Sequence, residues 1–321
     1  SVINVDEAKK TLTYDVGKML QGQAAGVTVQ SSGEPGGFVN LKIRGVTSFY
    51  NNNPLFVIDG MIVTDPGDFS TGDIESMQIL KDASAAAIYG SLGANGVVII
   101  TTKKGRKGLL DIKFNSQYGF QTVNKRWDVL NRTQYQQVTN AAETNAGIGL
   151  APGNDPTSPY FINNVDTNWQ DESFKTGTIS DNSLTLSGGG DNVTYNLNVD
   201  YFTNSSYVDT PQDYTRATTT FNLGGKKGKF TYGAKLGYTQ SNKNVFSEYL
   251  PGETGIADLL TSIPTVPVYD ANNLGGYGGA VNATQRAIML NTIGFNNLIT
   301  NEALRNRFIG NTWGQFEIIE G

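Results

Sequence analysis

Apolar and polar positions follow two different patterns along the chain, and the change occurs near residue 109. After it, the two kinds alternate with a period of two, which is typical of strands whose faces meet different surroundings. In the clearest stretch Tyr195, Leu197 and Val199 alternate with Asn196 and Asn198. The alternation predicts six strands, near residues 110–120, 184–186, 193–201, 216–223, 230–239 and 308–318.

The connections between these strands alternate in length. Asp191-Asn192 and the stretch from Gly224 to Gly228 predict short turns, whereas the segment before the second strand and residues 245–301 are long and rich in Asn, Gly, Thr and Pro. Short turns at one rim and long loops at the other are typical of outer-membrane barrels, whose apolar faces point to lipid and whose polar faces line the lumen. A soluble antiparallel sandwich, with its apolar faces inward, stays an alternative.

Before residue 109 the pattern is that of a compact α/β domain. Val16, Met19 and Leu20 fall on one helical face, with Asp15 placed to cap the helix. Asp59-Gly60 favours a two-residue hairpin turn, since Gly tolerates positive φ. Short apolar runs predict strands at residues 39–43, 55–58, 61–63 and 97–102, and an Ala-rich run predicts a helix at residues 83–89.

The composition excludes several kinds of chemistry. The 321 residues include no Cys and no His, which removes disulfides, thiolate nucleophiles, the usual zinc sites and every His-dependent triad. The formal net charge of −5 argues against a nucleic-acid partner, because such proteins usually carry a basic face. Paired carboxylates can cut glycosidic bonds without His. No spacing in the chain singles out such a pair, so no catalytic residue is assigned.

Three stretches of the first half form a set of motifs. Residues 41–45 read Leu-Lys-Ile-Arg-Gly, and residues 54–60 read Pro-Leu-Phe-Val-Ile-Asp-Gly. Residues 79–105 read Ile-Leu-Lys-Asp-Ala-Ser-Ala-Ala-Ala-Ile-Tyr-Gly-Ser-Leu-Gly-Ala-Asn-Gly-Val-Val-Ile-Ile-Thr-Thr-Lys-Lys-Gly. These motifs resemble the plug domain of TonB-dependent outer-membrane transporters, specifically the SusC/RagA-type nutrient importers. Residues 168–172 and 184–189 resemble the opening barrel strands of the same family.

The resemblance implies the fold of the whole protein. That fold is an antiparallel membrane β-barrel, 22-stranded in the full protein, with an N-terminal α/β plug domain that occludes its lumen. Residues 1–109 correspond to the plug, and residues 110–321 to the N-terminal part of the barrel with about six strands. Six strands cannot enclose a plug. We therefore expect the remaining strands, and the segment that contacts TonB, to lie outside this chain.

The resemblance also implies a location and a function. Proteins of this type lie in the bacterial outer membrane and import oligosaccharides or peptides. They draw energy through TonB and work with a SusD-like surface lipoprotein that covers the barrel as a lid. The expected partners are this lipoprotein, the TonB complex, the ligand and outer-membrane lipid. A β-rich outer-membrane or secreted glycan-active enzyme and a passive adhesin barrel stay as alternatives, although neither needs an occluding domain.

The outward loops of the plug are the predicted ligand-binding surface, because they follow strands and lack packing periodicity. Tyr50 offers a flat amphipathic face suited to a sugar or a peptide, and the adjacent amides offer donors and acceptors together. The residues assigned to ligand binding are Glu34, Tyr50, Asn51, Asn52 and Asn53. A polar loop of no special role is the alternative interpretation.

Other residues of the plug motifs are predicted to have structural roles, namely Arg44, Asp59, Gly60, Lys81, Asp82, Tyr89 and Gly90. Asp59 is expected to serve its turn. Arg44 is expected to form an ion pair with one of three carboxylates, those of Glu34, Glu75 and Asp82.

Two charged clusters have ordinary interpretations. The basic run from Lys103 to Lys107 predicts a solvated linker between plug and barrel. No cofactor and no metal ion is predicted, and calcium is kept as an alternative for a short run of oxygen ligands. That run consists of Asp166, Asn168, Asp171 and Glu172, and it lacks the glycine of the EF-hand loop.

Overall fold

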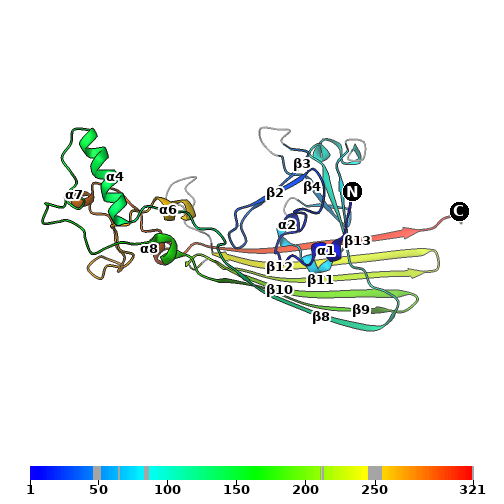
Figure 1. Cartoon of the computed structure of the whole chain (residues 1–321). Coiled ribbons are helices and arrows are strands. Elements are labelled where there is room, and N and C mark those ends of the chain that lie inside the picture. The colour runs from blue at the N-terminus through cyan, green and yellow to red at the C-terminus, as the bar shows by residue number, and fades with distance from the viewer. Residues whose placement is uncertain are drawn as a thin grey trace.

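The structure, a computed structural model, describes residues 1–319 except 46–51, 64–65, 83–86, 210, 212 and 245–254. It contains a six-stranded sheet in the order β13-β12-β11-β10-β9-β8 and a five-stranded sheet in the order β1-β6-β7-β4-β5. A third sheet pairs β2 with β3. Figure 1 shows the two smaller sheets and their short helices lying on one face of the large sheet, which curves around them.

The first 102 residues form the body that we call the plug. Its strands are β1 (Val2–Ile3), β2 (Val27–Ser31), β3 (Val39–Ile43), β4 (Leu55–Ile58), β5 (Met61–Val63), β6 (Ile74–Leu80) and β7 (Val97–Thr102). Its described helices are α1 (Val5–Ala8), α2 (Val16–Met19) and the 3-10 helices η1 (Pro66–Asp68), η2 (Thr71–Asp73) and η3 (Ala87–Gly93).

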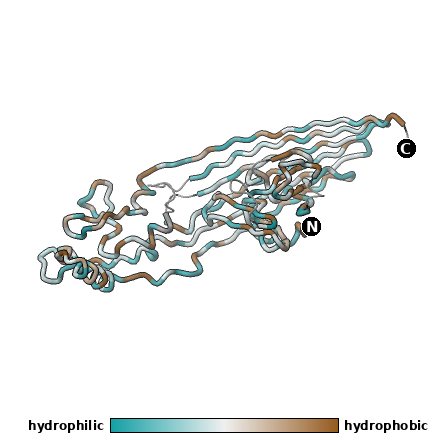
Figure 2. The backbone as a smooth tube through the Cα atoms, turned by 90° about the horizontal axis from the view of Figure 1, so that it is seen from above, coloured by the Kyte–Doolittle hydropathy of each residue, from teal (hydrophilic) through white to brown (hydrophobic). Residues whose placement is uncertain are grey.

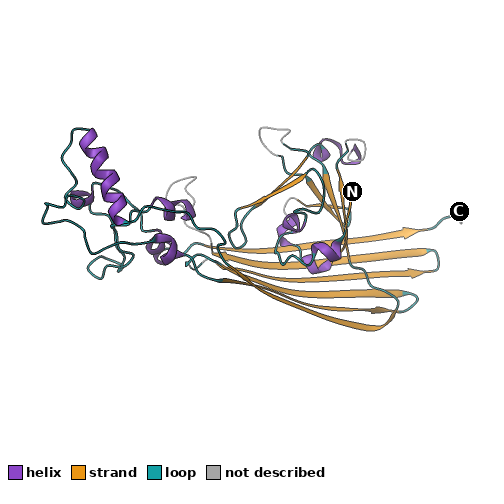
Figure 3. Cartoon of the chain, viewed as in Figure 1, coloured by secondary structure: helices purple, strands orange, loops and turns teal. Residues whose placement is uncertain are grey.

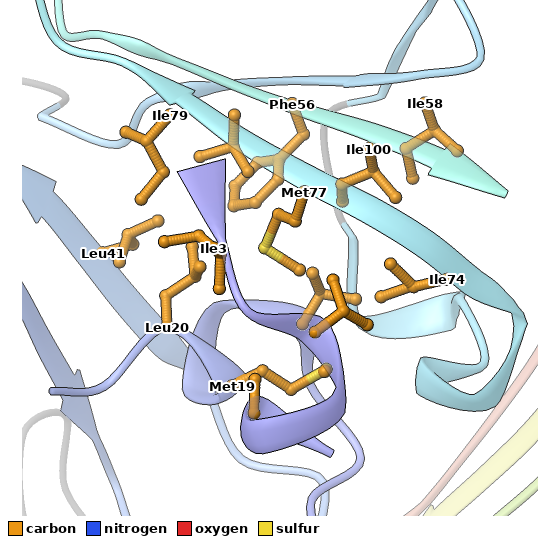
Figure 4. Packing of buried hydrophobic residues seen from close by; sticks show 14 of the residues in the cluster. Ile3, Met19, Leu20, Leu41, Phe56, Ile58, Ile74, Met77, Ile79 and Ile100 are labelled. Carbon is orange, nitrogen blue, oxygen red and sulfur yellow. The ribbon is translucent and has the colours of Figure 1, made fainter. Parts of the chain in front are cut away.

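The plug has an apolar core of its own. Met19 and Leu20, at the end of α2, pack with Ile58, Met77 and Ile100 from the five-stranded sheet, and all five are buried (Figure 4). The predicted helix at residues 16–20 is thus confirmed, as are the four predicted strands of this part. Burial of these side chains supplies most of the free energy that holds the small sheets and helices together.

Two local signals in the plug act as predicted. The Asp15 carboxylate caps α2, since it accepts hydrogen bonds from the backbone N–H groups of Gly17 (2.6 Å) and Lys18 (3.3 Å). Asp59 and Gly60 have φ values of 49° and 84° and join β4 to β5, as a primed hairpin turn requires. Of the helix predicted at residues 83–89, residues 83–86 lie outside the described part of the chain.

The large sheet, which we call the wall, consists of six antiparallel strands of 13–15 residues. They are β8 (Gly108–Gln121), β9 (Gly177–Gly189), β10 (Val193–Ser205), β11 (Asp213–Lys227), β12 (Phe230–Asn244) and β13 (Glu302–Phe316). All six predicted strands are confirmed, but most of the predicted bounds were too narrow, and the last strand ends at Phe316 rather than at residue 318. Residues 302–307 were missed because Glu302, Arg305 and Arg307 hide the alternation there.

The two faces of the wall have opposite polarity, as predicted. On β10 the side chain of Val199 is 43% exposed, whereas Asn198 and Asp200 are each 1% exposed because the plug covers that face. Tyr195 and Leu197 share the outer face with Val199 but are half-buried by side chains of the adjoining strands. Figure 2 shows hydrophilic and hydrophobic positions succeeding one another along the strands. The soluble sandwich is therefore wrong, because it requires the apolar face to be the covered one.

The connections of the wall are short at one end and long at the other. The β11–β12 turn is Gly228-Lys229 rather than the predicted stretch from Gly224, since β11 continues to Lys227. The long connections hold α4 (Arg132–Asn145), α5 (Trp169–Ser173), α6 (Gly255–Thr261), α7 (Asn282–Gln285) and α8 (Thr292–Leu298), which gather at one end in Figure 3. No helix among the described residues is long and apolar enough to cross a membrane.

The two long connections pack on each other and form what we call the loop module, residues 122–176 and the described part of 245–301. Trp169 is buried with Ile263 and Ile293, and its indole N–H donates to the carbonyl oxygen of Ile263 (3.0 Å). Arg286 pairs with Glu143 across the two connections (3.4 Å). The module therefore has its own small core beyond the end of the wall.

Candidate functional site

The plug meets the wall through polar side chains rather than through a shared apolar core. The face of the wall that the plug covers is lined by Thr, Asn, Ser and Asp side chains, together with two buried cationic side chains. These two cations are Arg216 on β11 and Lys235 on β12, and both reach plug atoms. The contact between plug and wall is the candidate functional site, since it decides whether the plug can move.

Arg216 is fully buried and holds the plug by its backbone. Its Nη1 donates to the carbonyl oxygens of Tyr14 (2.5 Å) and Gly67 (2.8 Å), which belong to two separate plug segments. Its Nη2 lies 3.5 Å from an Asp200 carboxylate oxygen on the neighbouring strand. The guanidinium carbon also lies 5.5 Å from the centre of the Phe202 ring. One wall side chain thus ties together two plug segments that the sequence separates widely.

Lys235 holds the plug by an ion pair with Asp59. The Lys235 ammonium donates to an Asp59 carboxylate oxygen and to the Thr102 hydroxyl (2.9 Å). Asp59 also accepts from the backbone N–H (2.9 Å) and the hydroxyl (2.6 Å) of Thr102. Burial alone raises the pKa of Asp59, but the charge and hydrogen bond of Lys235 and the hydrogen bonds from Thr102 hold it below its ordinary value. Asp59 was predicted to act in the hairpin turn, which describes its backbone. The ion pair of its side chain with the wall was not predicted.

Asp73 is a second carboxylate at this contact, and its charge is less well compensated. It lies in η2 and is 2% exposed. Burial raises its pKa to about 7, although Lys235 and Lys103 nearby oppose the shift and Asp59 adds to it. Ionisation of Asp73 near neutral pH therefore places a charge inside the plug–wall contact.

At the long-loop end of the plug, a cavity of about 600 Å³ opens between the plug and strands β11–β13. Its plug side includes Gly36, Phe38 and Asn53, and its wall side includes Tyr214 and Lys243. Aromatic, amide and ammonium groups line one space, which suits a ligand with apolar faces and hydroxyl or amide groups.

The β2–β3 loop beside this cavity is fixed against the wall. The Tyr14 hydroxyl donates to the carbonyl oxygen of Gly37 (2.6 Å), and the Tyr14 and Tyr214 rings lie 5.2 Å apart. Gly36 has a φ of 60°, and a Cβ there would lie 2.3 Å from the Tyr214 ring. Only glycine therefore fits at this position, and the loop is held in one place.

The structure brings only some of the predicted ligand-binding residues together. Asn53 lines the 600 Å³ cavity, and Asn52 beside it is half-buried. Glu34, within the β2–β3 loop, faces Lys243 across 4.0 Å but lines a different cavity. Tyr50 and Asn51 lie outside the described residues.

The predicted structural residues of the plug have local partners. Arg44 pairs with Asp82 (2.5 Å), which selects one of its three predicted carboxylates. The Lys81 ammonium donates to the carbonyl oxygen of Ala25. Tyr89 packs half-buried against Val57 and Val97. Gly60 and Gly90 have φ values of 84° and 59°, which the other amino acids rarely adopt.

The basic linker is only partly solvated. Arg106 and Lys107 are exposed and pair with Glu75 (3.2 Å) and Asp191 (2.8 Å). Lys103 is half-buried, and its carbonyl oxygen accepts from the Asn222 side chain of the wall (2.9 Å). The linker is therefore fastened to both bodies at its first residue.

The four residues named as an alternative calcium site are engaged elsewhere or lie apart from one another in function. Asp166 accepts from the backbone N–H of Arg132 (2.7 Å), Asn168 caps α5, and Asp171 pairs with Arg126. Glu172 lies in the first turn of α5. Among the described residues, no group of three or more acidic side chains is placed to hold a metal ion.

Comparison with known proteins places the chain in a family. A family model described as the TonB-dependent receptor plug domain matches residues 1–97. Over 302 residues the chain is 34% identical to the TonB-dependent receptor SusC of Bacteroides thetaiotaomicron. It belongs to the SusC/RagA type of TonB-dependent receptors. A second relative, the TonB-dependent receptor P3 of Formosa agariphila, is 35% identical over 283 residues.

The chain corresponds to one part of these receptors. The two alignments cover 88% and 85% of the chain but only 28% and 27% of the relatives. The structure of the RagAB peptide transporter superimposes on all of the chain with a TM-score of 0.79, at 24% identity, and the match covers 39% of that chain. The chain therefore has the predicted combination of an N-terminal plug and the first strands of a barrel, and the predicted location in the outer membrane.

Proposed function

We propose that the protein is an active importer of oligosaccharides or peptides, energised through TonB and assisted by a SusD-like lipoprotein. In this proposal the plug, residues 1–102, is the movable part, and the wall that begins with β8 is the first part of the barrel. The observation that carries it is the polar contact between plug and wall. Water can replace polar contacts of this kind when the plug shifts, whereas an apolar core would resist the change.

The ligand would first meet the plug at the cavity beside the β2–β3 loop. The cavity lies at the long-loop end, which faces outward in barrels of this kind. Asn53 and Lys243 supply polar groups, and Phe38, which is 67% exposed, supplies an apolar surface. Tyr50, Asn51 and Asn52 adjoin Asn53 in the sequence and keep their predicted role in ligand binding. The proposal requires no cofactor and no chemical step on the ligand, which separates it from the enzyme alternative.

The loop module is the proposed seat of the lipoprotein lid. Its two connections are fixed to each other by the buried cluster around Trp169. Leu274 and Ile288 on its surface are almost fully exposed. An apolar, pre-organised surface at the outward end suits a protein partner. RagAB is described as a peptide transporter, whereas the name of SusC states no ligand. The relatives therefore leave open whether the ligand is an oligosaccharide or a peptide.

Purification of the native protein in mild detergent tests the proposal. We expect a surface lipoprotein to copurify, and mass spectrometry of the released ligand to identify an oligosaccharide or a peptide. A matched preparation of an unrelated outer-membrane barrel from the same cells controls for carry-over. Repeated recovery of the protein without a lipoprotein, or conversion of an offered oligosaccharide or peptide by the pure protein, would contradict the proposal.

A further inference from the structure

A second cavity, of about 440 Å³, lies at the opposite end of the wall, beside the short turns. That end faces the periplasm in barrels of this kind. The cavity is enclosed by the linker, the start of the plug and the plug-facing side of β8–β10. It shares no lining residue with the cavity at the long-loop end.

Cationic groups outnumber acidic groups in this periplasmic cavity. The acids Glu75 and Asp111 are each engaged in an ion pair, with Arg106 (3.2 Å) and Lys113 (3.1 Å) respectively. The remaining lining cations are Lys9, Lys103, Lys104 and Lys107, of which Lys107 pairs with Asp191 at the rim (2.8 Å). Asp6 also lines the cavity, and the buried Asp73 lies close enough to Lys9 and Lys103 to raise the pKa of both. The cavity therefore holds an excess of positive charge.

The surroundings of Lys9 and Lys103 disfavour the charged form of both side chains. Burial and the neighbouring charge of Lys103 together lower the pKa of Lys9 to about 8, against the opposing charges of Asp6, Asp73 and Glu75. The pKa of Lys103 is also lowered, mainly by burial. Lys9 donates to the carbonyl oxygen of Ile74 (2.6 Å), whereas the ammonium groups of Lys103 and Lys104 form no hydrogen bond or ion pair with any described residue. An anion placed among them would relieve this cost.

Neutral donors complete the lining. Ser187 on β9 supplies a hydroxyl group and Asn196 on β10 supplies an amide, whereas the Thr185 hydroxyl in the same lining already donates to the Asn198 side-chain oxygen (2.9 Å). Ammonium groups on one side and hydroxyl or amide donors on the other are the groups that bind oxyanions. We propose that this cavity is a binding site for a phosphate-type oxyanion at the periplasmic mouth. The phosphate can be free in solution or carried by a lipid headgroup.

Amine labelling of the intact native transporter tests this site. At pH 8 about half of Lys9 is deprotonated and reactive, and a bound oxyanion would return its pKa toward the ordinary value of about 10.4. In phosphatidylcholine nanodiscs we expect saturating pyrophosphate to slow acetylation of Lys9 about tenfold or more, as read by mass spectrometry. Sodium chloride at equal ionic strength serves as the screening control. Slowing of Lys9 in phosphatidylglycerol nanodiscs without pyrophosphate would identify the headgroup as the source.

Two variants make the result specific to the cavity. Lys104→Gln removes one lining ammonium and is expected to weaken the protection of Lys9 several-fold. Lys229→Gln, an exposed lysine in the turn at the same end of the wall, is expected to leave the protection unchanged. Equal slowing by chloride and pyrophosphate, no slowing by any phosphate, or full protection in Lys104→Gln would each overturn the proposed site.

Discussion

Charged side chains of the wall hold the plug, and each acts on a defined group. Lys235 meets the Asp59 carboxylate, and Arg216 meets two backbone carbonyl groups. Removing one partner of a buried ion pair typically costs about 3 kcal/mol or more, because the other charge is left without compensation. Such contacts position the plug firmly while they last. They can be exchanged for water once the plug begins to leave.

Asp73 makes the plug–wall contact sensitive to pH. Its pKa of about 7 lies above the value of about 3.9 expected in the unfolded chain. The folded chain therefore binds more protons than the unfolded chain between these values, and its free energy of unfolding falls as the pH rises through this range. We expect the thermal midpoint of plug unfolding to decrease from pH 5 to pH 8. In Asp73→Asn the decrease should be clearly shallower.

A matched control is Asp128→Asn, which removes an exposed carboxylate of the loop module. It should reproduce the pH profile of the unchanged protein. An Asp73→Asn protein whose midpoint falls as steeply as before would mean that Asp73 is already ionised in the folded plug at pH 5.

At the scale of single elements, local patterns were enough to predict most of the fold. The cap and apolar face of α2, the turn at Asp59-Gly60 and the alternation along β10 depend on residues close in sequence. The ends of the strands were less predictable. Residues 302–307 of β13 and the last residues of β11 lack a clear apolar face, so backbone pairing with the neighbouring strands extends them there.

The partners across the plug–wall contact could not be predicted from sequence. Lys235 and Arg216 occupy polar positions in the alternation of their strands, but 176 residues separate Lys235 from Asp59. Many Thr and Asn positions share those faces and carry equivalent signals. The long block around Lys81, Asp82 and Tyr89 identified the family. It did not reveal which plug residues touch the wall.

The exposed face of β10 gives a prediction for the whole strand. Val199 is its central residue and points outward. Val199→Arg should destabilise the folded protein in lipid by about 2–4 kcal/mol, because burying a cation at the bilayer midplane is unfavourable. The measurement is the urea midpoint of the native transporter in liposomes, with Val199→Leu as the control. Equal midpoints for the two variants would show that Val199 does not face the membrane core.

On the scale of the whole molecule, the chain consists of the plug, the wall and the loop module. The plug occupies the polar side of the wall, the loop module stands beyond the outward end, and the linker joins plug to wall at the periplasmic end (Figure 1). A ligand entering at the outward cavity meets the plug before it can reach the periplasmic cavity. The central claim is therefore that the plug must shift against the wall during each import event.

A disulfide between plug and wall tests this claim most directly. A Cβ on Gly72 of the plug would lie 3.8 Å from the Cβ of Ser183 on β9, which matches the separation in natural disulfides. The chain has no Cys of its own, so Gly72→Cys with Ser183→Cys introduces a single pair. Each single variant serves as a control.

Uptake of the copurified ligand by cells, before and after reduction, is the measurement. We expect the oxidised double variant to lose uptake almost completely, to regain it when dithiothreitol opens the disulfide, and to bind ligand equally in both states. The single variants should import normally under both conditions. Undiminished uptake by a protein whose disulfide is shown to be fully formed would contradict the account, because the ligand would then cross without movement of the plug at this contact.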